Sequence, residues 1–306
     1  MTDGPPRRIA FLGFGLIAGS IARRLAGGRA AAGGGTDGPE LIAWSPSNRG
    51  PGGAAREGVI DRVAADAGAA ILGADLVVLG APPLETIELL EALGGRLRAA
   101  LAPDAVVTDV ASAKAAIVVA ADAAALRFVG GHPMAGRELA GYGAASADLF
   151  VDRPWVIVPG AAADEAAVER VAWLAAACGA HSIRMGAGEH DATVAAISHL
   201  PLVTSAALVE AVAGGAAERP DWPIAASLAA SGWRDMTRLA RGDATMGAGI
   251  AATNAPAIAA RLRDLRAALD AWIQDLEREG GPDPARLESR LRAVRDRLDR
   301  PPGSGA

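Results

Sequence analysis

Short apolar runs alternate with helix-compatible stretches along the first 187 residues. Each run has the length of a buried β-strand and is bounded by turn residues, and the stretches between the runs are long enough for crossover helices. This alternation predicts an α/β fold with a doubly wound, mostly parallel sheet. Seven strands are expected, at Ile9–Leu12, Leu41–Trp44, Asp75–Gly80, Ala105–Val110, Arg127–Gly130, Trp155–Pro159 and His181–Met185.

The pattern changes after residue 187, where no convincing strand follows. Three helical stretches are expected, at roughly 188–213, 222–240 and 254–279, followed by a charged helical tail. The third stretch is amphipathic, and core packing is the main interpretation of its apolar stripe. That stripe consists of Ile258, Leu262, Leu265, Leu269, Trp272 and Leu276. The sequence therefore predicts two domains, residues 1–187 and residues 188–306.

The amino-acid composition limits the classes of protein to which this chain can belong. The 306 residues are 51% hydrophobic and 21% charged, with a net charge of −5, which fits a globular chain long enough for two cores. The acidic balance and the lack of Lys/Arg runs argue against a nucleic-acid partner. Cys178 is the only cysteine, so an internal disulfide is excluded and a reducing compartment is indicated. No apolar run reaches the roughly 18 residues of a membrane span, and no signal core follows the N-terminus. We expect a cytoplasmic protein with no membrane partner and no metal site.

The first strand runs directly into the glycine-rich turn GFGLIAGS at residues 13–20. A strand, a G-x-G-x-x-A turn and a helix in this order are typical of dinucleotide binding. Gly13 permits the tight turn, Gly15 admits the pyrophosphate, and Ala18 lets the helix pack on the sheet. The helix N-terminus, at Leu16 and Ile17, supplies N–H donors to the phosphates. The alternative is an ordinary strand-to-helix turn.

The end of the second strand bears on the choice between NAD and NADP. NAD-binding folds usually place Asp or Glu there, to accept hydrogen bonds from the ribose hydroxyls. Here Ser45 takes that place and Arg49 follows, so a 2′-phosphate could be bound rather than repelled. The alternative is a turn with a surface arginine. NADP is expected at least as readily as NAD, and Ala81 and Pro82, after the third strand, are further candidate cofactor contacts.

His132 lies in the segment GGHPMAG, at the carboxyl end of the fifth strand. Ligand chemistry gathers at such ends in parallel sheets, and histidine is the side chain best suited to exchange a proton near neutral pH. The alternative is a histidine in a plain turn. Five further residues stand out, although each alone has an ordinary structural explanation, such as a helix cap, a core histidine or a surface cation. They are Ser112, Glu138, His199, Arg234 and Arg238.

Taken together, these segments resemble one family, the prephenate/arogenate (cyclohexadienyl) dehydrogenases. The resemblance runs from about residue 7 to 275 and rests on five motifs in matching order and spacing. They are GFGLIAGS (13–20), DVASAK (109–114), GHPMAG (131–136), SHLP (198–201) and GWRDMTR (232–238). The resemblance implies a Rossmann domain followed by an all-helical domain that forms a homodimer, with the active site in the cleft between them.

The resemblance also implies a reaction in tyrosine biosynthesis. A cyclohexadienol loses a hydride to NAD(P) and its ring carboxylate as CO₂, which gives an aromatic phenol. By motif position, His132 matches the histidine at the substrate hydroxyl, Ser112 the serine that orients this hydroxyl, and Arg238 the arginine on the ring carboxylate. Three more residues match substrate-pocket or neighbouring basic positions: His199, Glu138 and Arg234.

Two positions depart from the family pattern. Many members carry a second histidine three residues after the one matched by His199, where this chain has Leu202. Some members carry an aromatic residue where this chain has Gly247. Both departures concern the side-chain end of the substrate pocket rather than the ring chemistry.

Two other classes of function remain open. Other Rossmann dehydrogenases with a helical domain, such as 3-hydroxyacid or imine reductases, use a catalytic lysine on the helical domain, whereas the only lysine here is Lys114 on the α/β side. A non-catalytic nucleotide-binding relative would keep the fold without the chemistry. The joint presence of Ser112, His132 and Arg238 argues against it.

Overall fold

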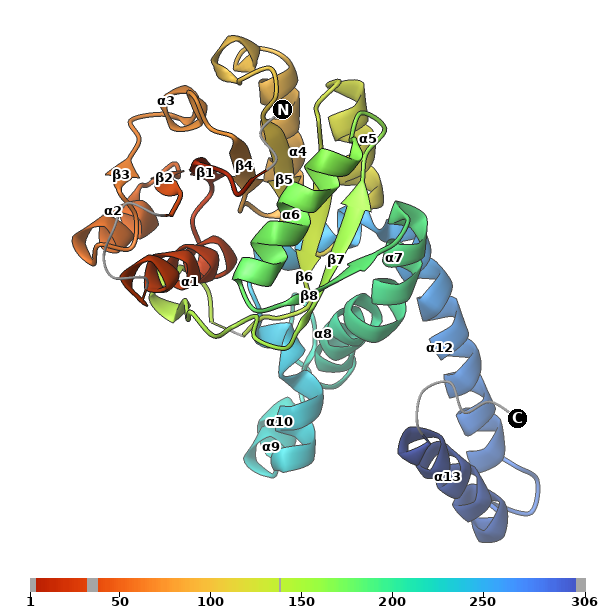
Figure 1. The fold of residues 1–306 in the computed structure, drawn as a ribbon. Coiled ribbons are helices and arrows are strands. Elements are labelled where there is room, and N and C mark those ends of the chain that lie inside the picture. The colour runs from red at the N-terminus through yellow and green to blue at the C-terminus, as the bar shows by residue number, and fades with distance from the viewer. Residues whose placement is uncertain (1–3, 32–37, 138, 301–306) are drawn as a thin grey trace. The chain divides into compact units, whose positions relative to one another are not determined.

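The computed structural model describes residues 4–31, 38–137 and 139–300. The chain divides into two compact units, one that ends at Ile258 and one that begins at Ala259. The first unit contains both sheets and most of the helices (Figure 1).

Five parallel strands form the main sheet, in the order β3-β2-β1-β4-β5. The central strand β1 pairs on both sides, so that Ile9 lies opposite Leu41 in β2 and Leu76 in β4. The strand order reverses between β1 and β4, and ligands bind at such a switch point in open α/β sheets. The strands are β1 Arg8–Leu12, β2 Glu40–Trp44, β3 Arg62–Val63, β4 Leu76–Leu79 and β5 Val106–Asp109.

Three more strands continue from the β5 edge. A parallel bridge between Val107 and Phe128 joins β5 to the segment leading into β6. Strand β6 pairs with β7 in antiparallel orientation, and β7 pairs with β8 in parallel. The strands are β6 Val129–Pro133, β7 Pro154–Pro159 and β8 His181–Arg184. One antiparallel pair among parallel ones confirms the mostly parallel sheet.

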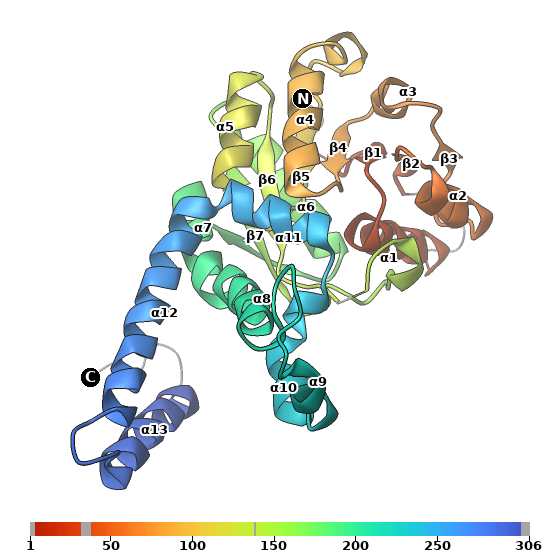
Figure 2. The same cartoon turned by 180° about the vertical axis from the view of Figure 1, so that it is seen from behind.

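Helices cover both faces of the sheet because its central strands are apolar on both sides. In β1, Ile9 and Phe11 face one core, with α1 and α6, while Ala10 and Leu12 face the other, with α3, α4 and α5. Figure 1 shows the α1 and α6 side, and Figure 2 the side of α4 and α5. The helices are α1 Leu16–Ala31, α2 Arg49–Arg56, α3 Ala67–Ile71, α4 Pro83–Gly94, α5 Ala115–Ala123 and α6 Glu165–Ala177, with 3₁₀ turns at Arg98–Ala100 and Tyr142–Ala144.

The chain after β8 is helical. Its first stretch is continuous but widens to a π turn at Ala195–His199. Pro201 follows in the first turn of α8 and has no N–H to donate one turn back, which accounts for this local widening. The elements are α7 Ala187–Val194, α8 Leu200–Ala213, α9 Trp222–Ser227, α10 Ser231–Thr237, α11 Ala244–Thr253, α12 Ala255–Leu276 and α13 Pro284–Asp299, with a 3₁₀ turn at Leu239–Arg241.

The second unit consists of most of α12 and of α13. Asp275 on α12 accepts hydrogen bonds from Arg286 Nε at 2.6 Å and Arg290 Nη1 at 2.8 Å, both on α13. The Arg290 guanidinium also lies over the Trp272 ring, 4.0 Å from its centroid. These charge-assisted contacts hold the two helices together.

Several sequence expectations need correction. Strand β6 continues through His132 to Pro133 instead of breaking after Gly130, because β7 pairs with it along this whole length. Strand β3 is too short to leave a hydrophobic pattern, and α11 lies in a segment rich in Ala and Gly that marks no buried face. The expected stripe of α12 is not core throughout, since Leu269 and Leu276 are each 52% exposed.

The glycine-rich loop expected at Gly27–Gly38 begins later than predicted. Helix α1 runs on to Ala31, so the first part of this segment is helical. Residues 32–37 lie outside the described residues.

Candidate active site

The carboxyl ends of the parallel strands meet at one edge of the sheet. β1, β2, β4 and β5 run in the same direction, and the bridge from β5 gives β6 that direction too. The residues at or just after these ends are Gly13, Ser45, Ala81, Ser112 and His132. The topology therefore brings the glycine turn and the candidate catalytic groups to the same edge.

The turn between β1 and α1 requires its first glycine. Gly13 has φ of +85°, and a Cβ built on it would lie 2.7 Å from the carbonyl carbon of Gly80. Ala18 is fully buried, and a Cβ on Gly80 would lie 2.8 Å from the Ala18 Cβ, so α1 packs tightly against the end of β4. A Cβ on Gly15, in contrast, would meet no atom within 4 Å. The turn is thus closed on the sheet side and open at Gly15.

A cavity of about 760 Å³ lies in front of this turn. Helix α1 begins at Leu16, so the backbone N–H groups of Leu16, Ile17 and Ala18 have no intrahelical acceptors and favour a bound anion. Ala81 and Pro82, after β4, form part of the wall. Open access at Gly15, free N–H donors and this volume fit a dinucleotide. The cavity also contacts Trp44, Ser45, Ser47, Arg49, Glu85, Glu88, Leu89, Arg96 and Tyr142.

Ser45 and Arg49 both lie on the wall of this cavity. The N–H of Ser45 donates to Asn48 Oδ1 at 2.9 Å, and Asn48 is in a left-handed conformation, so the turn after β2 is fixed. Arg49 begins α2 and is exposed. Arg96 is a second cation on the wall, and Glu85 and Glu88 of α4 also line the cavity; none of the three was predicted from the sequence.

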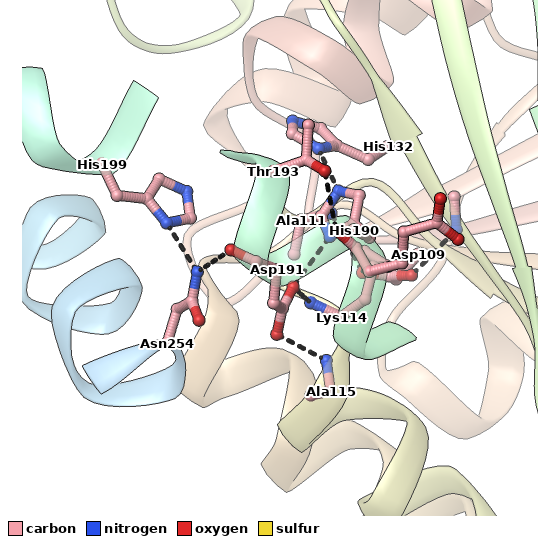
Figure 3. A network of polar contacts seen from close by, with 12 residues as sticks. Asp109, Ala111, Lys114, Ala115, His132, His190, Asp191, Thr193, His199 and Asn254 are labelled. Carbon is pink, nitrogen blue, oxygen red and sulfur yellow. Dashed lines mark hydrogen bonds and ion pairs between the residues drawn. The ribbon is translucent and has the colours of Figure 1, made fainter. Parts of the chain in front are cut away.

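A buried polar chain leads away from His132 (Figure 3). His132 Nδ1 lies 2.8 Å from Nε2 of His190, and His190 Nδ1 lies 2.7 Å from Oδ1 of Asp191. The Asp191 carboxylate also accepts the backbone N–H of Lys114 at 2.7 Å and of Ala115 at 2.8 Å, at the start of α5. A carboxylate at a helix N-terminus satisfies free donors and favours its own ionised form.

Asn254 connects this chain to His199. Its side-chain Nδ2 donates to the backbone carbonyl of Asp191 at 2.9 Å and lies 3.0 Å from Nδ1 of His199. His199 is fully buried, and its Nε2 has no hydrogen-bond partner among the described residues. Burial lowers the pKa of His199 to about 4, although the charge of Asp191 and the nearby backbone carbonyl of Ser112 oppose this shift.

The network contains both neutral and charged side chains. Burial, followed by the neighbouring His190, Lys114 and His199, holds the pKa of His132 well below its usual value. Burial alone would raise the pKa of Asp191, but hydrogen bonds from His190 and from the N–H groups of α5 together lower it. His132 is therefore a neutral imidazole at physiological pH, and Asp191 is a carboxylate.

Asp109 and Lys114 form a fully buried ion pair beside this chain. Burial lowers the pKa of Lys114, although Asp109 opposes the shift. The other Asp109 oxygen accepts the N–H of Gly131 at 3.1 Å, and a Cβ on Gly131 would lie 2.6 Å from the Asp109 carbonyl oxygen. The glycine before His132 thus allows β5 and β6 to approach closely.

The structure brings part of the predicted set together. His132, His199 and the backbone of Ser112 lie around the same buried network, and Ser112 is half-buried. Arg234 lies on α10 and Arg238 directly follows it, and both are exposed. Glu138 lies outside the described residues. In the described part of the chain, no group of three or more His, Cys, Asp or Glu side chains is arranged to hold a metal ion.

Three residues of this network, His190, Asp191 and Asn254, were not predicted from the sequence. The chain has only four histidines, and an adjacent His-Asp pair just after the last strand was a usable signal. Asn254 carried no such signal, because a single asparagine between two helices is ordinary.

Comparison with known proteins shows which family the chain belongs to. Residues 41–184 match the nucleotide-binding domain of prephenate dehydrogenase, and residues 186–288 match its dimerization domain. Prephenate dehydrogenase of Bacillus subtilis is 31% identical over 273 residues, which are 88% of this chain and 68% of that protein.

Two solved structures extend the comparison. The arogenate dehydrogenase of Synechocystis is 32% identical, with a TM-score of 0.73 over 95% of this chain and 99% of that one. The prephenate dehydrogenase of A. aeolicus, in complex with hydroxyphenyl propionate and NAD⁺, is 22% identical and shares the fold, with a TM-score of 0.81 over 96% of this chain and 98% of that one. The chain belongs to the prephenate/arogenate dehydrogenase family.

Proposed function

We propose that this chain catalyses the oxidative decarboxylation of prephenate, arogenate or both, in tyrosine biosynthesis, with hydride transfer to NAD(P). The products are 4-hydroxyphenylpyruvate or tyrosine. One observation carries this proposal. His132 is a neutral imidazole at the same sheet edge as a cavity that fits a dinucleotide. The reaction needs both a proton acceptor and a hydride acceptor at one place.

In this proposal His132 accepts the proton of the substrate hydroxyl. A nicotinamide bound in the cavity supplies the hydride acceptor for the carbinol carbon. The bond from the ring to its carboxylate then breaks, CO₂ leaves, and the bonding electrons complete the aromatic ring. The proton returns from His132 to the ring oxygen as the phenol forms. Ser112, at the end of β5 beside this edge, orients the hydroxyl.

The remaining predicted residues take the substrate's charged groups. Arg238 holds the ring carboxylate, since a guanidinium can bind a carboxylate in a bidentate, charge-assisted contact. Arg234 on α10 adds positive charge next to it, which is supported by its exposure. His199 and Glu138 complete the pocket around the substrate side chain, where Leu202 and Gly247 replace residues found in other members.

Turnover tests this function. The full chain is assayed with prephenate and with arogenate, with each cofactor, by reduced nicotinamide and by CO₂ release. His132→Asn is expected to lower kcat by about 10²–10⁴-fold, the usual contribution of a positioned base, and to leave cofactor affinity unchanged. His181→Asn, on the exposed strand β8, is the matched control and should behave as wild type. Normal turnover by His132→Asn would exclude His132 as the base.

Two other functions are less well supported. A 3-hydroxyacid or imine reductase would need a catalytic lysine, but Lys114 is buried and paired with Asp109. A non-catalytic nucleotide-binding protein would have no use for a neutral histidine supported by a buried His-Asp pair. The assay separates these possibilities, because neither predicts CO₂ release from prephenate or arogenate.

We further propose that NADP is accepted at least as well as NAD. Ser45 and Arg49 lie on the cavity wall at the end of β2, where a carboxylate would otherwise repel a 2′-phosphate. A charge-assisted contact from Arg49 is worth about 1.5–3 kcal/mol. Arg96 adds a second cation to this wall, although Glu85 and Glu88 of α4 oppose it.

The cofactor proposal is tested by kcat/KM for each cofactor in four proteins. Arg49→Ala should lower kcat/KM for NADP by about 10–150-fold, as the contact energy implies, and change the value for NAD little. Ser45→Asp should shift preference toward NAD. Arg56→Ala, at the other end of α2 and exposed, removes the same charge away from the cavity and serves as control. A wild type with strong NAD preference that Ser45→Asp does not change would refute the proposal.

We also propose a homodimer formed through the helical domain, residues 188–306, with residues 1–187 as the nucleotide-binding domain. The family's dimerization domain matches residues 186–288, which supports both statements. Apolar side chains of this region are exposed in a single chain, among them Ile197 at 64% and Leu228 at 79%. Sedimentation of the full chain tests this, and a species of 30.7 kDa at all concentrations would contradict it.

Location in the cytoplasm is part of the same proposal. By length and composition alone, the helical stretch Ala187–Ala213 is apolar enough to cross a membrane, and 22% of its most apolar part is buried. The stretch also carries His190, Asp191 and His199 in the polar network, and a subunit interface explains its apolar surface. Fractionation of cells that make the protein would decide this, and recovery in the membrane would count against it.

A further inference from the structure

His190 is a buried titratable side chain to which the proposed reaction assigns no role. It is fully buried on α7, between His132 on β6 and its own neighbour Asp191. Both ring nitrogens are engaged, Nε2 at 2.8 Å from His132 and Nδ1 at 2.7 Å from Asp191. The two imidazole rings are nearly perpendicular, at 71°, with centroids 5.1 Å apart. Burying three polar side chains in a row costs free energy unless each contact between them is a hydrogen bond.

The direction of these bonds follows from Asp191. Its carboxylate accepts two backbone N–H groups at the start of α5, which favours the ionised form, and an ionised carboxylate can only accept. His190 Nδ1 must therefore carry a hydrogen. In a neutral ring the other nitrogen, Nε2, is then an acceptor.

The position of the hydrogen on the His132 ring follows in the same way. Since His190 Nε2 accepts, His132 Nδ1 must donate and carries the hydrogen. His132 is neutral, so its Nε2 has a lone pair and no hydrogen. The opposite arrangement would need a doubly protonated His190 in the interior of the protein, which is costly because the ring is fully buried. The other charged or titratable groups around the two rings are Lys114, Asp191, Asp109 and His199.

We propose that His190 and Asp191 are positioning residues that hold His132 in the tautomer with Nε2 unprotonated, ready to accept the substrate's hydroxyl proton. The inference rests on the proposed function, because it gives this tautomer a task. When the proton arrives at Nε2, the Nδ1 hydrogen stays on His132, and the imidazolium is stabilised through His190 by the negative charge of Asp191. No proton needs to travel along the chain.

The arrangement is anchored outside the reaction centre. The N-terminus of α5 holds both oxygens of the Asp191 carboxylate, and Asn254 donates to the backbone carbonyl of Asp191. These bonds come from the α/β side and from α11's C-terminal end, so α7 is fixed between them. The orientation of His132 therefore depends on contacts made outside its own strand, at α5, α7 and the end of α11.

His190→Leu and Asp191→Asn test the inference together with His181→Leu, at an exposed histidine on β8 that serves as matched control. Leucine at position 190 can neither accept from His132 nor donate to Asp191, and an amide at position 191 can donate to His190 and reverse both tautomers. Each of the two variants is expected to lower kcat by about 10–10³-fold, with substrate KM and cofactor affinity within about threefold. The control should match wild type.

A second readout does not depend on turnover. Long-range ¹⁵N NMR of the ring nitrogens distinguishes an N–H from a lone pair, and the chain's four histidines are assigned by single substitution. Wild type should show His132 with hydrogen on Nδ1, and Asp191→Asn should show it on Nε2. Hydrogen on Nε2 of His132 in the wild type, or unchanged kcat in folded His190→Leu, would overturn the inference. If the wild type turns over neither substrate, the proposed function fails, and the NMR result alone decides the tautomer.

Discussion

Two glycines of the same turn should respond to alanine in opposite ways. Gly13 has φ of +85°, and its Cβ would lie 2.7 Å from Gly80 backbone, whereas a Cβ on Gly15 would meet nothing within 4 Å. Gly13→Ala should therefore destabilise the fold. Gly15→Ala should leave stability unchanged and weaken cofactor binding, because its methyl group projects into the space needed by the pyrophosphate.

The size of each effect follows from the geometry. At Gly13 the positive φ costs an alanine about 1–2 kcal/mol, and forcing its Cβ against the β4 end adds about 1–3 kcal/mol. A total of about 2–5 kcal/mol lowers Tm by roughly 3–8 °C in a chain of this size. At Gly15 the loss of even one charge-assisted contact to the phosphates, about 1.5–3 kcal/mol, raises the cofactor Kd by about 10–150-fold.

Both quantities are measured in both variants. Differential scanning fluorimetry without cofactor gives Tm, and fluorescence titration gives the cofactor Kd. Gly28→Ala, where a Cβ would also meet nothing within 4 Å, lies late in α1 and controls for substitution itself. The reasoning is refuted if Gly13→Ala melts with wild type, or if Gly15→Ala loses Tm but keeps its Kd.

Two further predictions concern the substrate and pH. Arg238→Ala should mainly raise KM for the ring-carboxylate substrates, by about 10–100-fold. Arg238→Lys should restore KM only partly, because the planar guanidinium that can bind a carboxylate with two hydrogen bonds is lost. Unchanged KM for both substrates would remove Arg238 from the site. The pKa of His199 is about 4 in the folded chain against 6.5 in an unfolded one. The unfolded state therefore binds more protons than the folded state below pH 6.5. The free energy of unfolding should fall by up to about 3 kcal/mol as the pH drops from 6.5 to 4. Urea unfolding of His199→Gln should lack this part of the fall.

Much of the fold could be predicted because its strands are buried on both faces. Such strands leave continuous apolar runs, and all seven predicted strands are present within a few residues. Parallel order then places strand ends at one edge, so the proximity of Gly13, Ser112 and His132 followed without coordinates. The two-residue strand β3 has no such run, and pairing with β7 extended β6 beyond the turn signal of its glycines.

The site could be predicted only where motifs or strand ends marked it. His190 and Asp191 lie on a helix 58 residues after His132, and no periodic pattern indicates which side chain of a helix reaches a distant strand. The register of that contact depends on how α7 packs against α5, a tertiary property. The π turn that ends at His199 likewise depends on Pro201, in a segment whose hydropathy pattern predicts one continuous helix.

Asp191 links the parts of the site that sequence motifs identified separately. Its side chain holds the start of α5, just after Ser112, and orients His190, and through it His132. Its backbone carbonyl is bound by the same Asn254 amide that contacts His199. An ionised carboxylate has enough acceptor sites for these side-chain bonds, whereas an amide has one acceptor oxygen. Replacing its side chain should therefore affect the start of α5 and, through His190, the tautomer of His132 together, although Asp191 itself has no place in any of the five motifs.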